Sequence, residues 1–223
     1  MASTTIDKQP LVNVAKRLQE MVERKEYNRV LDILDKIKIP DYSTLVYEDV
    51  SEHLYDGCEE TMIFPSGGVS KYVLTLSNGK QLSIRDKDFW KLVKAENSIM
   101  GAWQIFLLEN IWTYLPLFWH SNYERRHYFY TKEDFIKYIN EERDEKLDIE
   151  GIDDIQIGIG ADEGSFFKLV NIDNCYVLKA FYWSEHKGLV SHYEIIMFIG
   201  DSVHILRPQK ETVIIKYDCG IMY

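Results

Sequence analysis

The feature that most constrains the fold is a succession of strand-like segments at residues 155–217. These segments are rich in β-branched and aromatic residues, which favour strands, and they read IQIGIG, SFFKLVNI, CYVLKAFYW, HYEIIMFI, SVHILR and TVIIKY. Most connectors are short and rich in turn-forming residues, as at Asp173-Asn174, and the longest spans 184–191. Because short connectors join antiparallel neighbours, the pattern predicts an antiparallel meander of about six strands.

The first part of the chain shows helical spacing instead. Apolar residues recur every three or four positions over 9–24 and again over 27–38, where Pro40 ends the pattern. We therefore expect two short amphipathic helices joined at residues 25–27. Neither helix can bury its apolar stripe alone, so the pair must dock on the rest of this chain or on another chain.

A long apolar segment occupies residues 98–119, with Ser98 or Asn97 as its expected cap. Gln104 and Glu109 lie near its centre, and an ionised glutamate is costly in the middle of a bilayer. We interpret the segment as a buried helix and expect no membrane contact.

Local turn and cap signals complete the pattern. Asn78-Gly79 lies between two alternating runs and predicts a β-hairpin near 71–85 with a two-residue type I′ turn. Asp86 is expected to cap a short helix, and Thr131 to cap an amphipathic helix with Asp134 at its third position.

These signals together predict an α+β protein. Its expected parts are an N-terminal helical hairpin, a β-hairpin and a long buried helix, packed with a C-terminal antiparallel meander of about six strands. We expect a mainly helical lobe at 1–150 and an antiparallel β lobe at 151–223, folding as one cooperative unit. Residues 41–70 fit either helix or strand.

The charge pattern bears on the choice of partner. The chain has a formal net charge of −10, which argues against direct nucleic-acid binding, since that needs a basic face. Residues 141–154 hold more than half of the excess negative charge, which fits the steering of a basic protein partner. The expected partner-binding residues are Glu141, Glu142, Asp144, Glu145 and Asp148. A homo-oligomer and a hetero-oligomer both stay open.

Cysteine and histidine spacing gives no metal or cofactor signature. Cys58, Cys175 and Cys219 are widely spaced without a CxxC pair, which favours reduced thiols and a cytoplasmic location. The N-terminus is polar and does not resemble a signal peptide. His186 and His192, with Glu185 and Glu194 beside them, could meet through strand pairing, but we expect solvated loop-end residues and predict no metal and no cofactor.

The densest group of chemically active residues is FWHSNYERRHYFY at 118–130. Arg125 and Arg126 could bind a phosphate or carboxylate, with Tyr123 and Tyr128 stacking a base. His120 and His127 are the fallback catalytic residues, because they titrate near neutral pH. Adjacent strand residues point to opposite faces, however. If 126–130 is a strand, Arg126, Tyr128 and Tyr130 share one face, while His127 and Phe129 share the other.

No enzyme fingerprint is present, since the chain has neither a GxxxxGK[ST] loop nor a GxSxG elbow. We therefore favour a non-enzymatic protein-binding module, such as an inhibitor, an immunity or anti-defence protein, or an adaptor subunit, acting through an acidic, Tyr-rich surface. The alternative is an enzyme or sensor that binds a phosphorylated or otherwise anionic small ligand through Arg125, Arg126, His120 and His127.

Overall fold

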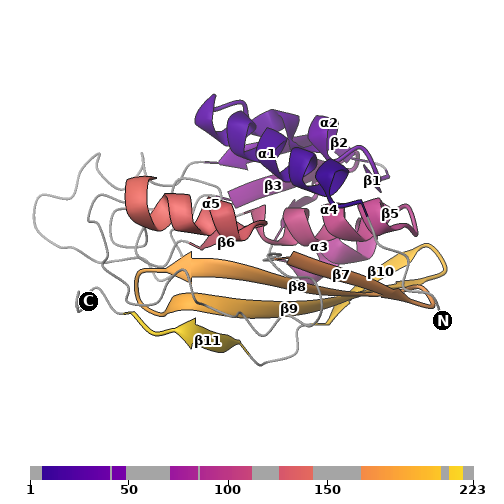
Figure 1. The fold of residues 1–223 in the computed structure, drawn as a ribbon. Helices are drawn as coiled ribbons and strands as arrows, with labels where there is room; N and C mark the ends of the chain where they lie inside the picture. The colour runs from indigo at the N-terminus through magenta and orange to yellow at the C-terminus, as the bar shows by residue number, and fades with distance from the viewer. Residues whose placement is uncertain are drawn as a thin grey trace, which may run out of the picture. The chain divides into compact units, whose positions relative to one another are not determined.

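The structure is a computed structural model that describes residues 7–40, 42–48, 71–84, 86–111, 126–142, 167–206 and 211–217 (Figure 1). The chain divides into two compact units. One comprises Met1–Arg125 with Ile196–His204, and the other Arg126–Ile195 with Ile205–Tyr223. The predicted α+β class is confirmed, with helices in the N-terminal part and a six-stranded antiparallel sheet formed largely by the C-terminal part. Among the described helices, none has the length and apolar character needed to cross a membrane.

The first unit begins with α1 (Gln9–Glu23), whose apolar stripe is buried as its spacing predicts. Its end is a Schellman motif: the Lys25 N–H donates to Val22 O at 3.0 Å and the Glu26 N–H to Met21 O at 2.9 Å. Lys25 takes the left-handed conformation there, with φ +58°. A lysine therefore occupies the position that glycine usually fills, which turns the chain sharply away from α1.

The prediction of a second helix over 27–38 is wrong for the residues after Ile33. The structure has a 3₁₀ turn, η1 (Tyr27–Arg29), a short α2 (Val30–Ile33), and then β1 (Ile37–Lys38). The short strand pairs antiparallel with β5 (Lys94–Ala95). Just before it, the Lys36 N–H donates to the buried Gln104 side chain at 2.7 Å. Long-range hydrogen bonds therefore override the helical spacing of 34–38.

The buried helix is α4 (Ile99–Glu109), in which every residue from 101 to 109 is buried. Ser98 is its cap, because its side chain accepts from the Gly101 N–H at 3.1 Å. The Trp103 indole donates to Leu11 O of α1 at 2.7 Å, which ties the two helices together. Asp86 stands at the start of α3 (Lys87–Leu92), but its carboxylate accepts from the Ser83 N–H instead of capping the helix.

The predicted β-hairpin is present in a three-stranded sheet of β2 (Tyr42–Glu48), β3 (Lys71–Leu76) and β4 (Gln81–Ser83). The predicted turn type is wrong. In this turn only Gly79 has a positive φ. The Gly79 N–H donates to Leu76 O and the Leu76 N–H donates to Lys80 O, at 2.9 Å each. This is a three-residue loop with a glycine bulge, because only one residue adopts the left-handed conformation that type I′ requires twice.

The six-stranded sheet is built around one long hairpin, β8 (Cys175–Ser184) and β9 (Gly188–Ile199). The outer edge of β8 pairs with β7 (Phe167–Ile172) and then with β6 (His127–Phe129). The outer edge of β9 pairs with β10 (Ser202–Leu206) and β11 (Thr212–Ile215). Five of the six predicted strands are confirmed, and the segment at 155–160 lies outside the described residues.

Two turns connect β7, β8 and β9. Asp173 and Asn174 both have positive φ, so the type I′ turn joins β7 to β8. The connector predicted over 184–191 is too long, because β8 continues to Ser184 and β9 begins at Gly188. Gly188 has φ +81°, and a side chain there would meet Ile215 O and Tyr217 N. The glycine thus lets β11 lie close against the start of β9.

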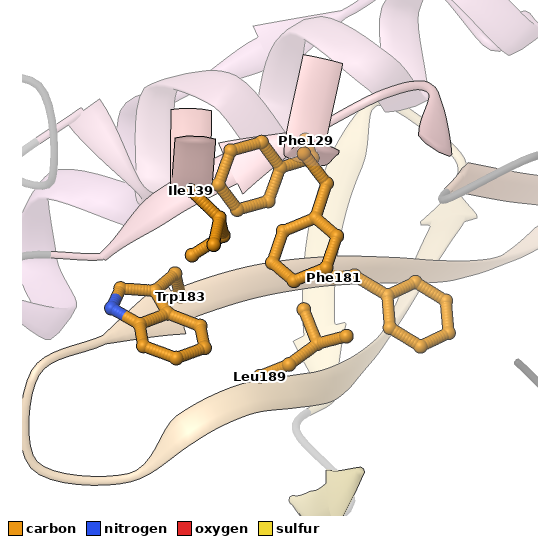
Figure 2. Packing of buried hydrophobic residues seen from close by; sticks show 6 residues of the cluster. Phe129, Ile139, Phe181, Trp183 and Leu189 are labelled. Carbon is orange, nitrogen blue, oxygen red and sulfur yellow. The ribbon is translucent and has the colours of Figure 1, made fainter. Parts of the chain in front are cut away.

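One face of this hairpin is apolar and packs against α5 (Lys132–Lys137) and the π turn at Tyr138–Glu142, labelled η5. Figure 2 shows Phe129 and Ile139 directed toward Phe181, Trp183 and Leu189 of the long hairpin. Thr131 caps α5 as predicted, accepting from the Asp134 N–H at 3.0 Å. This packing fixes β6, and therefore the residues beside it.

Candidate functional site

The predicted site at 118–130 is described only from Arg126 onward. His120, Tyr123 and Arg125 lie outside the described residues. Tyr128 lies opposite Tyr182 on β8, and His127 opposite Trp183. The alternation expected for a strand is present, so Arg126 and Tyr128 face one side of the sheet and His127 faces the other.

His127 belongs to the apolar face. Its ring lies 4.7 Å from the ring of Tyr138, on the side where Phe129 packs against Phe135. The structure therefore separates His127 from Arg126, and the two do not converge on one pocket. His127 acts there as a packed, half-buried aromatic ring.

Arg126 lies at the centre of a polar cluster on the opposite face. Its Nη2 is 3.0 Å from Glu211 Oε1, and its guanidinium carbon is 4.7 Å from the centre of the Tyr182 ring. Lys187 Nζ contacts the other carboxylate oxygen, Glu211 Oε2, at 2.8 Å. One carboxylate thus bridges two cations that come from different parts of the sheet.

A histidine–glutamate pair adjoins this carboxylate. His192 Nε2 is 2.8 Å from Glu194 Oε1, and His192 Nδ1 is 3.9 Å from Glu211 Oε1. His192 and Glu194 are two residues apart on β9, so both point to the same face. With Glu194 ionised, a neutral His192 carries its proton on Nε2, because an ionised carboxylate can only accept. Its Nδ1 is then the nitrogen that would gain a proton in acid.

The polar cluster comprises Arg126, Tyr128, Tyr182, Lys187, His192, Glu194 and Glu211. Tyr182, His192 and Glu194 are buried, whereas the side chains of Arg126, Lys187 and Glu211 are partly exposed.

Burial and charge shift the pKa values in this cluster. Burial, reinforced by the positive charge of Arg126, lowers the pKa of His192 to about 4, against a weaker opposing effect of Glu211. Burial acts to raise the pKa of Glu211, but the hydrogen bond from Lys187 and the charge of Arg126 outweigh it and lower that pKa. Near neutral pH, His192 is therefore uncharged and Glu211 is ionised.

The two tyrosines stay protonated. Burial raises the pKa of Tyr128 well above its usual value and also raises that of Tyr182. Burial alone would lower the pKa of Arg126, but Tyr128, Tyr182 and Glu211 raise it, and Tyr128 also accepts a hydrogen bond from the guanidinium. Arg126 thus remains a fixed cation beside the Tyr128 hydroxyl and over the Tyr182 ring.

The sequence pointed to only part of this cluster. Glu211 reaches His192 through strand pairing, because Thr212 lies opposite Ser191 on β9. The turn before β9 brings Lys187 close to Glu211. The one usable signal was the spacing of His192 and Glu194 on a strand, which placed both side chains on one face.

The metal hypothesis gains no support from the geometry. Glu185 accepts the Trp183 indole N–H at 2.9 Å, while Glu194 contacts His192. Within the described ranges, no group of three or more His, Cys, Asp or Glu side chains is arranged to hold a metal ion. The cluster's chemistry is that of an internal network of ion pairs and hydrogen bonds.

The predicted acidic partner site is only partly described. Glu141 is exposed at the end of the turn that follows α5, and the backbone of Glu142 lies in the same turn. Asp144, Glu145 and Asp148 lie outside the described residues.

The fold and the cluster define an α+β protein with a long β-hairpin, one apolar face and one polar face. Comparisons with protein-family models, curated proteins and solved structures find no match to this chain.

Proposed function

We propose that this chain is a protein-binding module that receives its partner at the sheet edge formed by the end of β10 and by β11. The observation that supports it is the exposure of three large apolar side chains on this edge. Leu206 is 49%, Val213 47% and Ile214 38% exposed. Isolated exposed apolar residues are ordinary, but Val213 and Ile214 are adjacent on a strand at the margin of the sheet.

Strand edges bind partners through their main chain. β11 pairs with β9 on one side, and an outer strand edge offers N–H and C=O groups to an extended segment of another protein. Side chains on such a strand then choose the partner, because alternate residues face opposite sides of the sheet. The proposed partner therefore presents an extended segment with apolar side chains.

The charge of the chain adds a second property to the partner. At a net charge of −10, the chain attracts a basic protein over a distance of about one Debye length, roughly 8 Å at physiological salt. Glu141, exposed after α5, belongs to the acidic stretch that we propose contributes most to this attraction. We therefore propose a basic partner whose binding weakens as salt concentration rises.

Affinity enrichment from an extract of the native host tests the edge. The wild-type chain should enrich a specific partner, and Val213→Lys should lose at least about tenfold of it because lysines block strand addition at an edge. Ile172→Lys is the matched control, since Ile172 is 58% exposed at the β7–β8 turn, away from this edge. Equal enrichment by both variants, or none by the wild type, would contradict the proposal.

The acidic contribution is tested separately with a variant that replaces Glu141, Glu142 and Glu145 by Gln and Asp144 by Asn. It should bind the enriched partner more weakly at low salt and with a shallower salt dependence. Unchanged affinity at low salt would remove the acidic stretch from the binding surface and leave the edge proposal standing.

A further inference from the structure

Two cations converge on one carboxylate at the margin of the long hairpin. Arg126 Nη2 contacts Glu211 Oε1 at 3.0 Å, and Lys187 Nζ contacts Glu211 Oε2 at 2.8 Å. Arg126 immediately precedes β6, Lys187 lies in the β8–β9 turn, and Glu211 immediately precedes β11. Each carboxylate oxygen therefore has its own cation, which is the arrangement used to bind phosphates and carboxylates in proteins.

Contacts independent of Glu211 hold the Arg126 guanidinium and the backbone of Lys187. The Arg126 guanidinium lies over the Tyr182 ring at 4.7 Å and donates to the Tyr128 hydroxyl. Lys187 lies in a tight turn, where its N–H donates to Ser184 O at 3.2 Å. Arg126 would therefore keep its position if the carboxylate moved away, and the turn would keep the backbone of Lys187, and with it the base of its side chain, beside Arg126.

Glu211 itself is held by a weak element. It precedes β11, which has four residues, and Thr212, Val213 and Ile214 are all exposed. The pairing of β11 with β9 is also irregular, with a register shift between Val213 and Ile215. A short, bulged edge strand opens at low free-energy cost, so its first residue can leave the cations more easily than a core residue could.

Water reaches all three side chains. Arg126 is 22%, Glu211 30% and Lys187 49% exposed. A small anion in solution can therefore approach the cations. With Glu211 displaced, two positive charges would face one remaining carboxylate of the polar cluster, Glu194, which already contacts His192 at 2.8 Å. The vacated position would carry a net positive potential.

We propose that Arg126 and Lys187 form a binding site for a phosphate or carboxylate group, and that Glu211 is its internal occupant. A ligand with such a group competes with Glu211, and its binding frees the start of β11 from β9. This site differs from the one the sequence suggested, because Lys187 takes the place of Arg125 and the histidines at 120 and 127. The proposal does not depend on the protein-binding function.

Glu211→Gln provides the direct test, since it removes the competing charge and keeps the size of the side chain. Its thermal stability should rise with sodium phosphate and sodium acetate, measured against sodium chloride at matched ionic strength. The half-maximal concentration should lie at least about tenfold below that of the wild type. The two arms report which oxyanion the site prefers. Asp201→Asn, which breaks the exposed Lys94–Asp201 pair at 3.3 Å, is the matched control and should respond as the wild type does.

The double variant Arg126→Gln with Glu211→Gln removes both charges of the pair together and should lose the response. A response that survives in this double variant would overturn the proposal, as would equal behaviour of Glu211→Gln and wild type in all three salts.

A second measurement uses the wild type alone and so does not depend on the stability of any variant. Amide hydrogen exchange of residues 211–215 should be faster in phosphate than in chloride at equal ionic strength and pH, while residues 175–183 of β8 should be unaffected. Unchanged exchange at 211–215 in saturating phosphate would also overturn the proposal.

Discussion

His192 shows how burial sets the behaviour of a single side chain. Its imidazole lies between the carboxylates of Glu194 and Glu211, yet its pKa falls to about 4 because burial and Arg126 together outweigh the attraction of Glu211. The folded pKa lies below the usual value of 6.5, so the unfolded chain binds an extra proton between these two values. The free energy of unfolding therefore falls as the pH drops from 6.5 to 4.

The size of this effect can be measured with His192→Gln, which keeps a hydrogen-bonding side chain and does not titrate. The full shift corresponds to at most about 3 kcal/mol at low pH. We expect urea unfolding between pH 6.5 and 4.5 to show a decrease in stability that is about 2 kcal/mol smaller in the variant than in the wild type. His204→Gln, at an exposed position on β10, should keep the wild-type decrease. Parallel pH curves for His192→Gln and wild type would refute this assignment.

At the residue scale, local alternation predicted the face on which each side chain lies. It separated Arg126 and Tyr128 from His127 and Phe129, and the structure confirms that separation. It could not predict the partners of Arg126, because Glu211 and Lys187 are brought close only by strand pairing and a turn far along the chain. Register between distant strands depends on the whole sheet, so a single sequence carries little information about it.

At the element scale, predictions succeeded where the local signal agreed with the tertiary contacts. Ser98 and Thr131 cap their helices, and the five strand segments that the structure describes between residues 167 and 215 form strands. The helix expected over 27–38 failed because the backbone of Lys36 bonds the Gln104 side chain and β1 pairs with β5. Apolar residues do recur at helical spacing over 27–38, but the hydrogen bond to the buried helix α4 and the pairing with β5 stabilise a different structure there.

The end of α1 gives a prediction at this scale. Lys25 adopts a left-handed φ of +58° in the Schellman motif, which is unfavourable for a residue with a Cβ atom. Lys25→Gly should therefore raise the free energy of unfolding by about 0.5–1 kcal/mol, measured by urea or thermal unfolding. Arg24→Gly is the control, because Arg24 has an ordinary helical φ of −82° and should lose stability on the same change. A decrease for Lys25→Gly equal to that of Arg24→Gly would show that the strain is absent.

At the scale of the whole molecule, the α+β class followed from the change of period between the two parts of the chain. The grouping into compact units did not follow from that change. Ile196–His204 belongs with Met1–Arg125, although the rest of β9 belongs with the other unit. Such a grouping depends on long-range packing that no local pattern records. The apolar edge of β10 and β11 likewise became visible only once the order of the strands was known.

The central claim is that this edge binds another protein, and site-specific photo-crosslinking in the native host tests it most directly. A benzophenone amino acid at position 213 should form a covalent adduct with one partner protein, because Val213 lies on the exposed edge. The same amino acid at position 172, also exposed but at the β7–β8 turn, should form none. Adducts of equal yield at both positions, or none at position 213, would contradict the account.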